Sequence, residues 1–293
     1  MPDTALPILA AQEVAATAGA LIDRYDILQN GSTLVVRLSE TLVARVVTDT
    51  GGARDGTAWF ERETKLASHL AAHGAPVIPP HPELPPGPYL QRGFPINFWQ
   101  FVTRVDATAL PVEAGSTLHH CHRLLRDFPG ELPFLGILTE SMDLLETLAR
   151  QEKFSPTVTA LLQRRLAESI DLLRNFPHQP IHGDAHLGNL MNTTDGLLWT
   201  DWEDGFLGPV EWDLASAIWN ARLLDADHRT ADAILAGYRQ AGGDFNPDAL
   251  RQCLIARAAV MSIWYPVLYP NPSEERQDKL KRRLEWLENP SGI

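Results

Sequence analysis

The sequence is poor in cysteine and has no long apolar run. Its 293 residues include two cysteines, Cys121 and Cys253. Two are too few for a disulfide framework or a cysteine-rich metal site, and they fit a reducing compartment. The longest apolar stretch, 258–269, is too short to cross a bilayer. The first residues lack the basic and then apolar segments of a secretory signal. We therefore expect a cytoplasmic protein that does not enter a membrane.

An excess of positive charge is also missing. Asp and Glu number 37 and Lys and Arg 25, which gives a formal net charge of -12. Nucleic-acid backbones are bound by clustered Lys and Arg, so we expect no nucleic-acid partner. An acidic surface attracts cationic small molecules instead. Lysine is the scarcer basic residue, and none precedes Lys65.

The first third of the chain has the pattern of a small β-rich lobe. Short runs rich in Val and Leu, separated by polar turns, are typical of an antiparallel meander. Helical spacing of apolar residues, with Gly74 and Pro76 as stop signals after the second segment, predicts two helices. The expected strands are 25–29, 33–38, 42–47 and 96–102, and the expected helices are 12–23 and 56–73. A proline-dense loop covers 79–88.

After about Val105 the pattern is almost wholly helical. The expected helices are 113–126, 140–151, 156–175, 211–224, 227–241 and 247–265. One interruption, 180–201, reads as two short strands around a polar loop. The sequence thus predicts an α+β protein with a small N-terminal lobe, 1–105, and a larger helical lobe, 106–293.

The polar loop in this interruption carries the strongest chemical signal. Residues 181–189 read IHGDAHLGN, and Asp201 follows twelve residues after Asn189. The spacing from Asp184 to Asn189 matches H-x-D-x-x-x-x-N, in which Asp takes the proton of an acceptor hydroxyl and Asn holds Mg²⁺. Oxygen ligands such as Asn189 and Asp201 suit Mg²⁺. A motif with so few fixed residues also occurs by chance, and a second line of sequence evidence is therefore needed.

That signal comes from a family resemblance. The runs HGDAHLGN (182–189), DWE (201–203) and EWDL (211–214) resemble the aminoglycoside phosphotransferase (APH) family, which shares the fold of the eukaryotic protein kinases. The resemblance extends from Tyr25 to about Leu224. It implies that Asp184 is the catalytic base and that Asn189 and Asp201 are the Mg²⁺ ligands. It also implies that His182 and Asp213 support the loop.

A kinase fold grips phosphate with a strand lysine that is paired with a helix glutamate. With no lysine before Lys65, the third strand offers Arg45, which keeps the charge and adds bidentate geometry. Arg37 on the preceding strand is an alternative phosphate contact. The other alternative is that Arg45 faces solvent and contacts no phosphate. Glu63 lies on the apolar face of the 56–73 helix, where a carboxylate needs a cation. We expect it to pair with Arg45.

Two further nucleotide contacts are weaker expectations. The turn with Gly31 and Ser32 would cover the phosphates, although an ordinary hairpin turn has the same residues and the G-x-G-x-x-G loop is absent. Gln100, Phe101 and Val102 would lie against the adenine, and a buried strand explains them equally well. A helical cluster at His119, His120 and His122 lacks a carboxylate at zinc-ligand spacing, so we expect His122 in the core.

These residues predict Mg²⁺-dependent transfer of the γ-phosphate of ATP, or of GTP, to a hydroxyl of a small molecule. An aminoglycoside-type antibiotic, choline, a sugar or an amino alcohol is a candidate acceptor, and the acidic balance favours a cationic one. A protein kinase is disfavoured, because Asp201-Trp202-Glu203 replaces D-F-G and no A-P-E follows. A nucleotide-binding module without catalysis is the other alternative, and it would have lost one of Asp184, Asn189 or Asp201.

Overall fold

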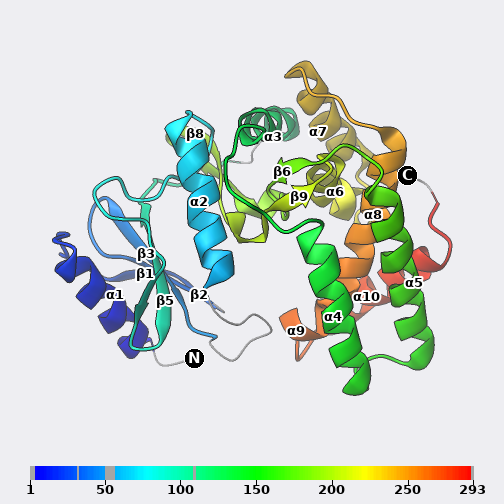
Figure 1. Cartoon of the computed structure of the whole chain (residues 1–293), viewed down its shortest axis with the longest axis horizontal. Coiled ribbons are helices and arrows are strands. Elements are labelled where there is room, and N and C mark those ends of the chain that lie inside the picture. Colours follow the sequence, from blue (N-terminus) through cyan, green and yellow to red (C-terminus); the bar gives the residue numbers. More distant parts are fainter. Residues whose placement is uncertain (1–3, 32, 50–56, 108–109, 292–293) are drawn as a thin grey trace. The chain divides into compact units, whose positions relative to one another are not determined.

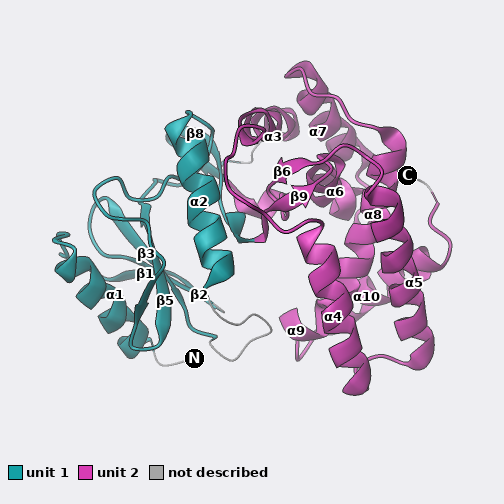
Figure 2. Ribbon diagram, in the orientation of Figure 1, with its two compact units in different colours: residues 1–108, 191–203 teal, residues 109–190, 204–293 magenta. Residues whose placement is uncertain are grey.

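The computed structural model describes residues 4–31, 33–49, 57–107 and 110–291. The chain divides into two compact units, which Figure 2 distinguishes by colour. The N-terminal unit consists of Met1–Thr108 and Met191–Glu203, and the C-terminal unit of Ala109–Leu190 and Asp204–Ile293. The sequence places a single division near Val105. The structure adds the later segment Met191–Glu203 to the N-terminal unit.

The N-terminal unit is built on an antiparallel sheet of five strands in the order β1-β2-β3-β5-β4. The strands are β1 (Asp26–Asn30), β2 (Thr33–Arg37), β3 (Leu42–Val47), β4 (Tyr89–Gln91) and β5 (Phe94–Gln100). The expected meander is therefore confirmed. The short strand β4 was not expected, because its three residues follow directly on the proline-dense loop and carry little periodicity.

One helix covers each face of this sheet (Figure 1). On one face Val36, Ala44 and Val46 pack with residues of α1 (Ala5–Thr17) in one buried cluster. On the other face Val47 packs with the first turn of α2 (Ala58–Ala72). Successive side chains of a strand point to opposite faces, so Arg45, between Ala44 and Val46, points toward α2.

The opening helix lies earlier in the chain than expected. It spans Ala5–Thr17, and not 12–23. Gly19 has a φ of +83°, the left-handed conformation in which glycine commonly ends helices. Leu21 and Ile22 continue the helical spacing by coincidence and lie outside the helix. The end of α2 follows the expectation, since Gly74 has a φ of +73°.

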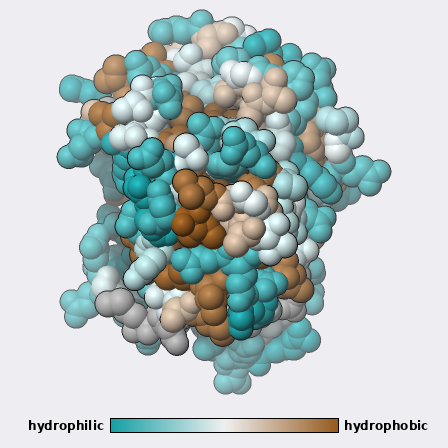
Figure 3. Space-filling view, turned by 90° about the vertical axis from the view of Figure 1, so that its left-hand side faces the viewer, coloured by the Kyte–Doolittle hydropathy of each residue, from teal (hydrophilic) through white to brown (hydrophobic). Residues whose placement is uncertain are grey.

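The N-terminal unit carries several exposed apolar side chains. Figure 3 shows one face of the molecule, and an apolar patch interrupts the largely hydrophilic surface near its centre. Leu6 and Leu9 of α1 are 44% and 42% exposed, and Leu21 and Leu90 are 72% and 69% exposed. Single exposed leucines of this kind are normal in folded proteins.

The C-terminal unit is mostly helical, as expected. Its α-helices are α3 (Pro111–Leu125), α4 (Gly136–Arg150), α5 (Pro156–Leu173), α6 (Glu211–Trp219), α7 (His228–Gln240), α8 (Pro247–Ile263), α9 (Tyr265–Leu268) and α10 (Glu274–Glu288). The expected helix 211–224 is divided, because its second part, Asn220–Leu224, is a π-helix. Helix α10 was not expected: only Arg283 and Leu287 of it are buried, so its apolar stripe is faint.

Short strands frame the polar loop. In the C-terminal unit β6 (Gln179–Ile181) pairs with β9 (Phe206–Gly208) in antiparallel fashion. Between them in sequence come β7 (Leu190–Thr193) and β8 (Gly196–Trp199), which pair with each other. None of the helices in the described part of the chain is long and apolar enough to cross a membrane.

Helices α3 and α7 pack unusually closely through two glycines. A Cβ atom on Gly115 would lie 2.0 Å from the carbonyl oxygen of Ile234, and one on Gly237 would lie 1.9 Å from that of Val112. Real Cβ atoms do not approach a carbonyl oxygen so closely, so only glycine lets the two backbones meet here. The contact fixes α3 against α7.

Candidate active site

The loop between β6 and β7 presents Asp184 with each carboxylate oxygen engaged. Arg257 Nη2, from α8, forms an ion pair with Oδ1. Asn189 Nδ2 donates to Oδ2 at 3.3 Å and to the backbone oxygen of Asp184 at 3.0 Å. Since Nδ2 makes both contacts, the Oδ1 atom of Asn189 is the one that could accept a cation. The loop therefore offers a fixed carboxylate beside an amide oxygen.

Asp213 of α6 accepts hydrogen bonds from the backbone of this loop. Asp213 Oδ2 accepts the N–H of His182 at 2.7 Å, and Oδ1 accepts that of Gly183 at 2.9 Å. The indole of Trp212 donates to the oxygen of Gly183 at 2.6 Å, and His182 Nδ1 accepts the N–H of Asp184 at 3.3 Å. Asp213 and His182 are fully buried. The sequence interpretation of both as loop supports matches these contacts.

A buried chain of polar groups continues from Asp213 into the helices. His122 of α3 places Nε2 2.8 Å from Asp213 Oδ2, and its Nδ1 lies 3.0 Å from the hydroxyl of Tyr238 on α7. His122 is 1% exposed, so it is a core histidine as expected. Because His122 contacts both Asp213 and Tyr238, it also links α3 and α7 to the loop.

Gly183 fills a conformation that other residues avoid. Its φ is +85°, and a Cβ atom there would lie 1.9 Å from the backbone oxygen of Asp204. Left-handed φ and the lack of space both require glycine. The turn that brings Asp184 out of β6 depends on this residue.

In the N-terminal unit, Arg45 of β3 is surrounded by three carboxylates. Arg45 Nη1 lies 2.7 Å from Glu63 Oε1, so the expected ion pair is present. Arg45 Nη2 lies 2.6 Å from Glu203 Oε2 and 3.1 Å from Asp201 Oδ1. The side chain of Glu63 is 2% exposed. Arg45 is thus oriented by carboxylates from α2 and from the segment after β8.

The charged groups of this cluster change one another's pKa values. Burial raises the pKa of Glu63 to about 7; Arg45 opposes this shift and the charge of Asp201 adds to it. Burial also disfavours the Arg45 cation, but the nearby carboxylates outweigh it and hold its pKa well above the usual value. Arg45 therefore remains a permanent positive charge in this unit.

Asp201 has features of a metal ligand. Its φ of +67° is a conformation that non-glycine residues seldom adopt, and such strain gathers at functional sites. Its Oδ1 atom is buried and forms an ion pair with Arg45 Nη2 at 3.1 Å, and it accepts no hydrogen bond from the described residues. A carboxylate oxygen that accepts no hydrogen bond suits a hard cation such as Mg²⁺.

Arg37, the alternative phosphate grip, is engaged elsewhere. Its guanidinium donates to the backbone oxygens of Ser39 at 2.9 Å and Glu40 at 3.0 Å. It also lies over the ring of Phe101, with Cζ 3.6 Å from the ring centroid. Arg37 thus stabilises the turn after β2, and Arg45 is the better candidate.

The remaining expected nucleotide contacts are only partly described. Gly31 closes the β1–β2 turn, and Ser32 lies outside the described residues. The N–H of Gln100 donates to the oxygen of Pro79 and that of Phe101 to the oxygen of Thr41. An adenine could not use these two donors without breaking a bond. Val102 follows the end of β5, and its part in nucleotide binding stays a prediction.

Residues 14–253 match the profile of the phosphotransferase enzyme family, APH. The chain belongs to this family. The match includes Arg45, Asp184, Asn189 and Asp201, and it ends within α8.

Solved structures show that the fold of this APH family member is kinase-like. Amicoumacin kinase hAmiN, in complex with AMP-PNP, Ca²⁺ and Ami, superposes with a TM-score of 0.74 at 14% identity over 100% of this chain and 97% of that one. Choline kinase LicA from Streptococcus pneumoniae gives 0.64 at 13% identity over 94% and 97%. A LicA homolog of Metamycoplasma hominis is 29% identical over 123 residues, 39% of this chain. The chain thus spans about half of that relative, 47% of its length.

Sequence reasoning missed one charged residue of the candidate site, Arg257. Glu203, which the sequence places near the site in the run 201–203, binds Arg45, a pairing that the sequence did not predict. Arg257 binds Asp184 from a helix whose other buried residues carry no charge. A single arginine beside the longest apolar stretch was a signal for Arg257, because a buried cation needs an anion.

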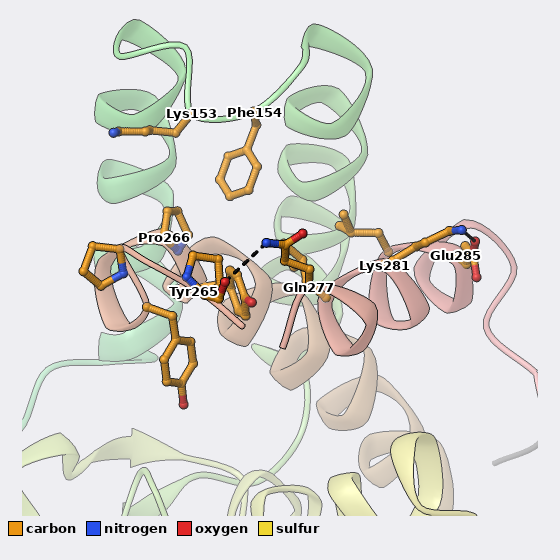
Figure 4. A pocket seen from close by; sticks show the side chains of 12 residues that line it. Lys153, Phe154, Tyr265, Pro266, Gln277, Lys281 and Glu285 are labelled. Atoms are coloured by element: carbon orange, nitrogen blue, oxygen red, sulfur yellow. Dashed lines mark hydrogen bonds and ion pairs between the residues drawn. The ribbon is translucent and has the colours of Figure 1, made fainter. Parts of the chain in front are cut away.

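A cavity of about 490 Å³ lies elsewhere in the C-terminal unit (Figure 4). Its walls come from the α4–α5 loop, α9 and α10 and include Lys153, Phe154, Tyr265, Tyr269 and Lys281. The hydroxyl of Tyr265 is buried and has no hydrogen-bond partner among the described residues. None of the residues predicted to be catalytic or nucleotide-binding lines this cavity.

Proposed function

We propose that this APH family member transfers the γ-phosphate of a Mg²⁺-bound nucleotide to a hydroxyl of a small molecule. The fixed carboxylate of Asp184 carries the proposal. Phosphoryl transfer depends on positioning and charge more than on covalent chemistry. A carboxylate that is held through both oxygens, on a loop whose backbone is bonded to a buried aspartate, suits that requirement.

In this proposal Asp184 orients the acceptor hydroxyl and receives its proton as the oxygen attacks phosphorus. Asn189, through Oδ1, and Asp201, through its carboxylate, are the proposed ligands of Mg²⁺. When bound, Mg²⁺ neutralises charge on the β- and γ-phosphate oxygens.

The N-terminal unit would supply the nucleotide grip. Arg45, kept charged and oriented by Glu63, would meet the phosphates. Since Arg45 also binds Glu203, a phosphate would compete with that carboxylate for Nη2. Gly31 and Ser32 would cover the phosphates, and residues 100–102 would lie along the base, which is adenine or guanine.

The acceptor is a small molecule with a hydroxyl group. Antibiotics and choline are named for the similar solved structures, and each remains a candidate here together with sugars and amino alcohols. The net charge of -12 favours a cationic acceptor, because a negative surface concentrates cations.

The test is transfer of labelled γ-phosphate from Mg²⁺-ATP and Mg²⁺-GTP to a panel of aminoglycosides, macrolides, choline, amino alcohols and sugars. Asp184→Ala is expected to abolish the product. Asp195→Asn, an exposed position in the β7–β8 turn, is the matched control and is expected to keep it. Nucleotide binding without any transfer favours a non-catalytic module, phosphorylated protein favours a protein kinase, and absence of nucleotide binding rejects the proposal.

A further inference from the structure

Arg257 is an exception within its own helix. Among the buried residues of α8 it is the only one with a charge, and its side chain is 4% exposed. A guanidinium is costly to bury unless an anion compensates it. The carboxylate that does so is Asp184, through Oδ1.

The contact is directed at the side chain and not at the loop backbone. The backbone of residues 182 and 183 is already bonded to Asp213. Asn189 Nδ2 reaches the other carboxylate oxygen of Asp184 at 3.3 Å, and the imidazole of His186 lies 3.5 Å from that oxygen. Arg257 thus fixes Oδ1, and the rotation of the carboxylate about its Cβ–Cγ bond is restrained from both sides.

A second buried arginine shows what a packing role looks like. Arg283 of α10 is 6% exposed; it donates to the backbone oxygen of Met261 at 3.3 Å and lies over the rings of Trp219 and Tyr265. Among the described residues no carboxylate pairs with it. Arg283 binds a backbone carbonyl near the end of α8. Arg257 instead binds the carboxylate of Asp184, which the proposed reaction uses.

We propose that Arg257 is a positioning residue, which orients the Asp184 carboxylate so that one oxygen faces the acceptor hydroxyl. The inference rests on the proposed phosphotransfer and assigns a residue to it that the catalytic motif does not contain. Misplacement of a reacting group by about 1 Å lowers a rate by about 100-fold. A lysine at this position would keep the charge but lose the planar fork, so it should restore the rate only in part.

The experiment compares Arg257→Met and Arg257→Lys with Arg283→Met as the control for loss of a buried arginine. Phosphotransfer is measured with the acceptor found in the panel, and thermal unfolding is followed for every variant. For Arg257→Met we expect kcat to fall by about 100-fold and the KM for nucleotide to change less than about 2-fold. Arg257→Lys should recover at least part of kcat, and added guanidinium ion should partly rescue Arg257→Met. Arg283→Met should keep kcat even if it unfolds earlier.

A double-mutant cycle with Asp184→Asn decides whether Arg257 acts through Asp184. If it does, Arg257→Met changes the residual rate of Asp184→Asn by less than about 3-fold, because the carboxylate that it orients is already gone. The inference would be overturned if the rate losses of the two single variants multiplied in the double variant. It would also be overturned if Arg257→Met raised the KM for the acceptor and left kcat unchanged. If the wild-type protein transfers phosphate and Arg257→Met keeps its kcat, this inference alone fails. If the wild-type protein transfers none to any acceptor or to water, the proposed function fails with it.

Discussion

The buried carboxylate of Asp213, which binds the backbone of the loop that carries Asp184, gives the sharpest prediction. Asp213 accepts three hydrogen bonds, from the N–H groups of His182 and Gly183 and from His122, at 2.7, 2.9 and 2.8 Å. A hydrogen bond to a charged group contributes about 1.5–3 kcal/mol and a neutral one about 1 kcal/mol. Asp213→Asn keeps the shape but places an NH₂ group where one oxygen accepted. One bond is lost and two become neutral, while removal of a buried charge offsets part of the loss.

We expect Asp213→Asn to lower the free energy of unfolding of the C-terminal unit by about 3 kcal/mol, since the three weakened bonds outweigh the relief of desolvation. Urea unfolding measures this change. Hydrogen exchange of the His182 and Gly183 amides should quicken by roughly 100-fold, because every 1.4 kcal/mol is a factor of ten. Asp171→Asn is the control, because its side chain is 78% exposed and paired only loosely, at 3.8 Å, with Arg174. An unfolding free energy within about 1 kcal/mol of the wild type, with unchanged protection of both amides, would refute this account of the loop.

Three smaller predictions follow from single contacts. Arg45→Met leaves Glu63 buried without its cation and should destabilise the protein by about 3–5 kcal/mol in urea, and Arg45→Lys by clearly less; equal losses would contradict the ion-pair argument. Gly183→Ala would place a Cβ 1.9 Å from the Asp204 oxygen, so we expect loss of phosphotransfer with unchanged circular dichroism, and an active variant would show that the loop can shift. Tyr265→Phe removes a buried hydroxyl without a described partner, so the melting temperature should stay or rise, and a clear fall would reveal a bond to that hydroxyl.

The sequence could predict the contacts that local patterns determine. The pairing of Arg45 with Glu63 follows from strand alternation and from one helix face, and both patterns are visible in a few residues. The same holds for the spacing of Asp184 and Asn189. The contacts of His122 and Arg257 join residues 91 and 73 positions apart from their partners, and no local pattern encodes such a distance.

The misplaced elements have equally local causes. The first helix ends before Gly19, although apolar residues continue at helical spacing, because conformational preference at one glycine outweighs a periodic pattern. Helix α10 is rich in charged residues and buries only two side chains, so it lacks the apolar stripe by which helices are recognised. The π-helix after α6 has a composition that an α-helix would also have, so its sequence does not distinguish the two.

The two glycines at the contact of α3 and α7 make the protein sensitive to substitution at positions outside the candidate site. His122 lies on α3 and Tyr238 on α7, next to Gly237, and both belong to the hydrogen-bonded chain that ends at the loop carrying Asp184. One methyl group at Gly115 or Gly237 would have to wedge the helices apart and thereby stretch that chain. Inactivating substitutions in this enzyme family member should therefore appear at positions that touch neither nucleotide nor acceptor.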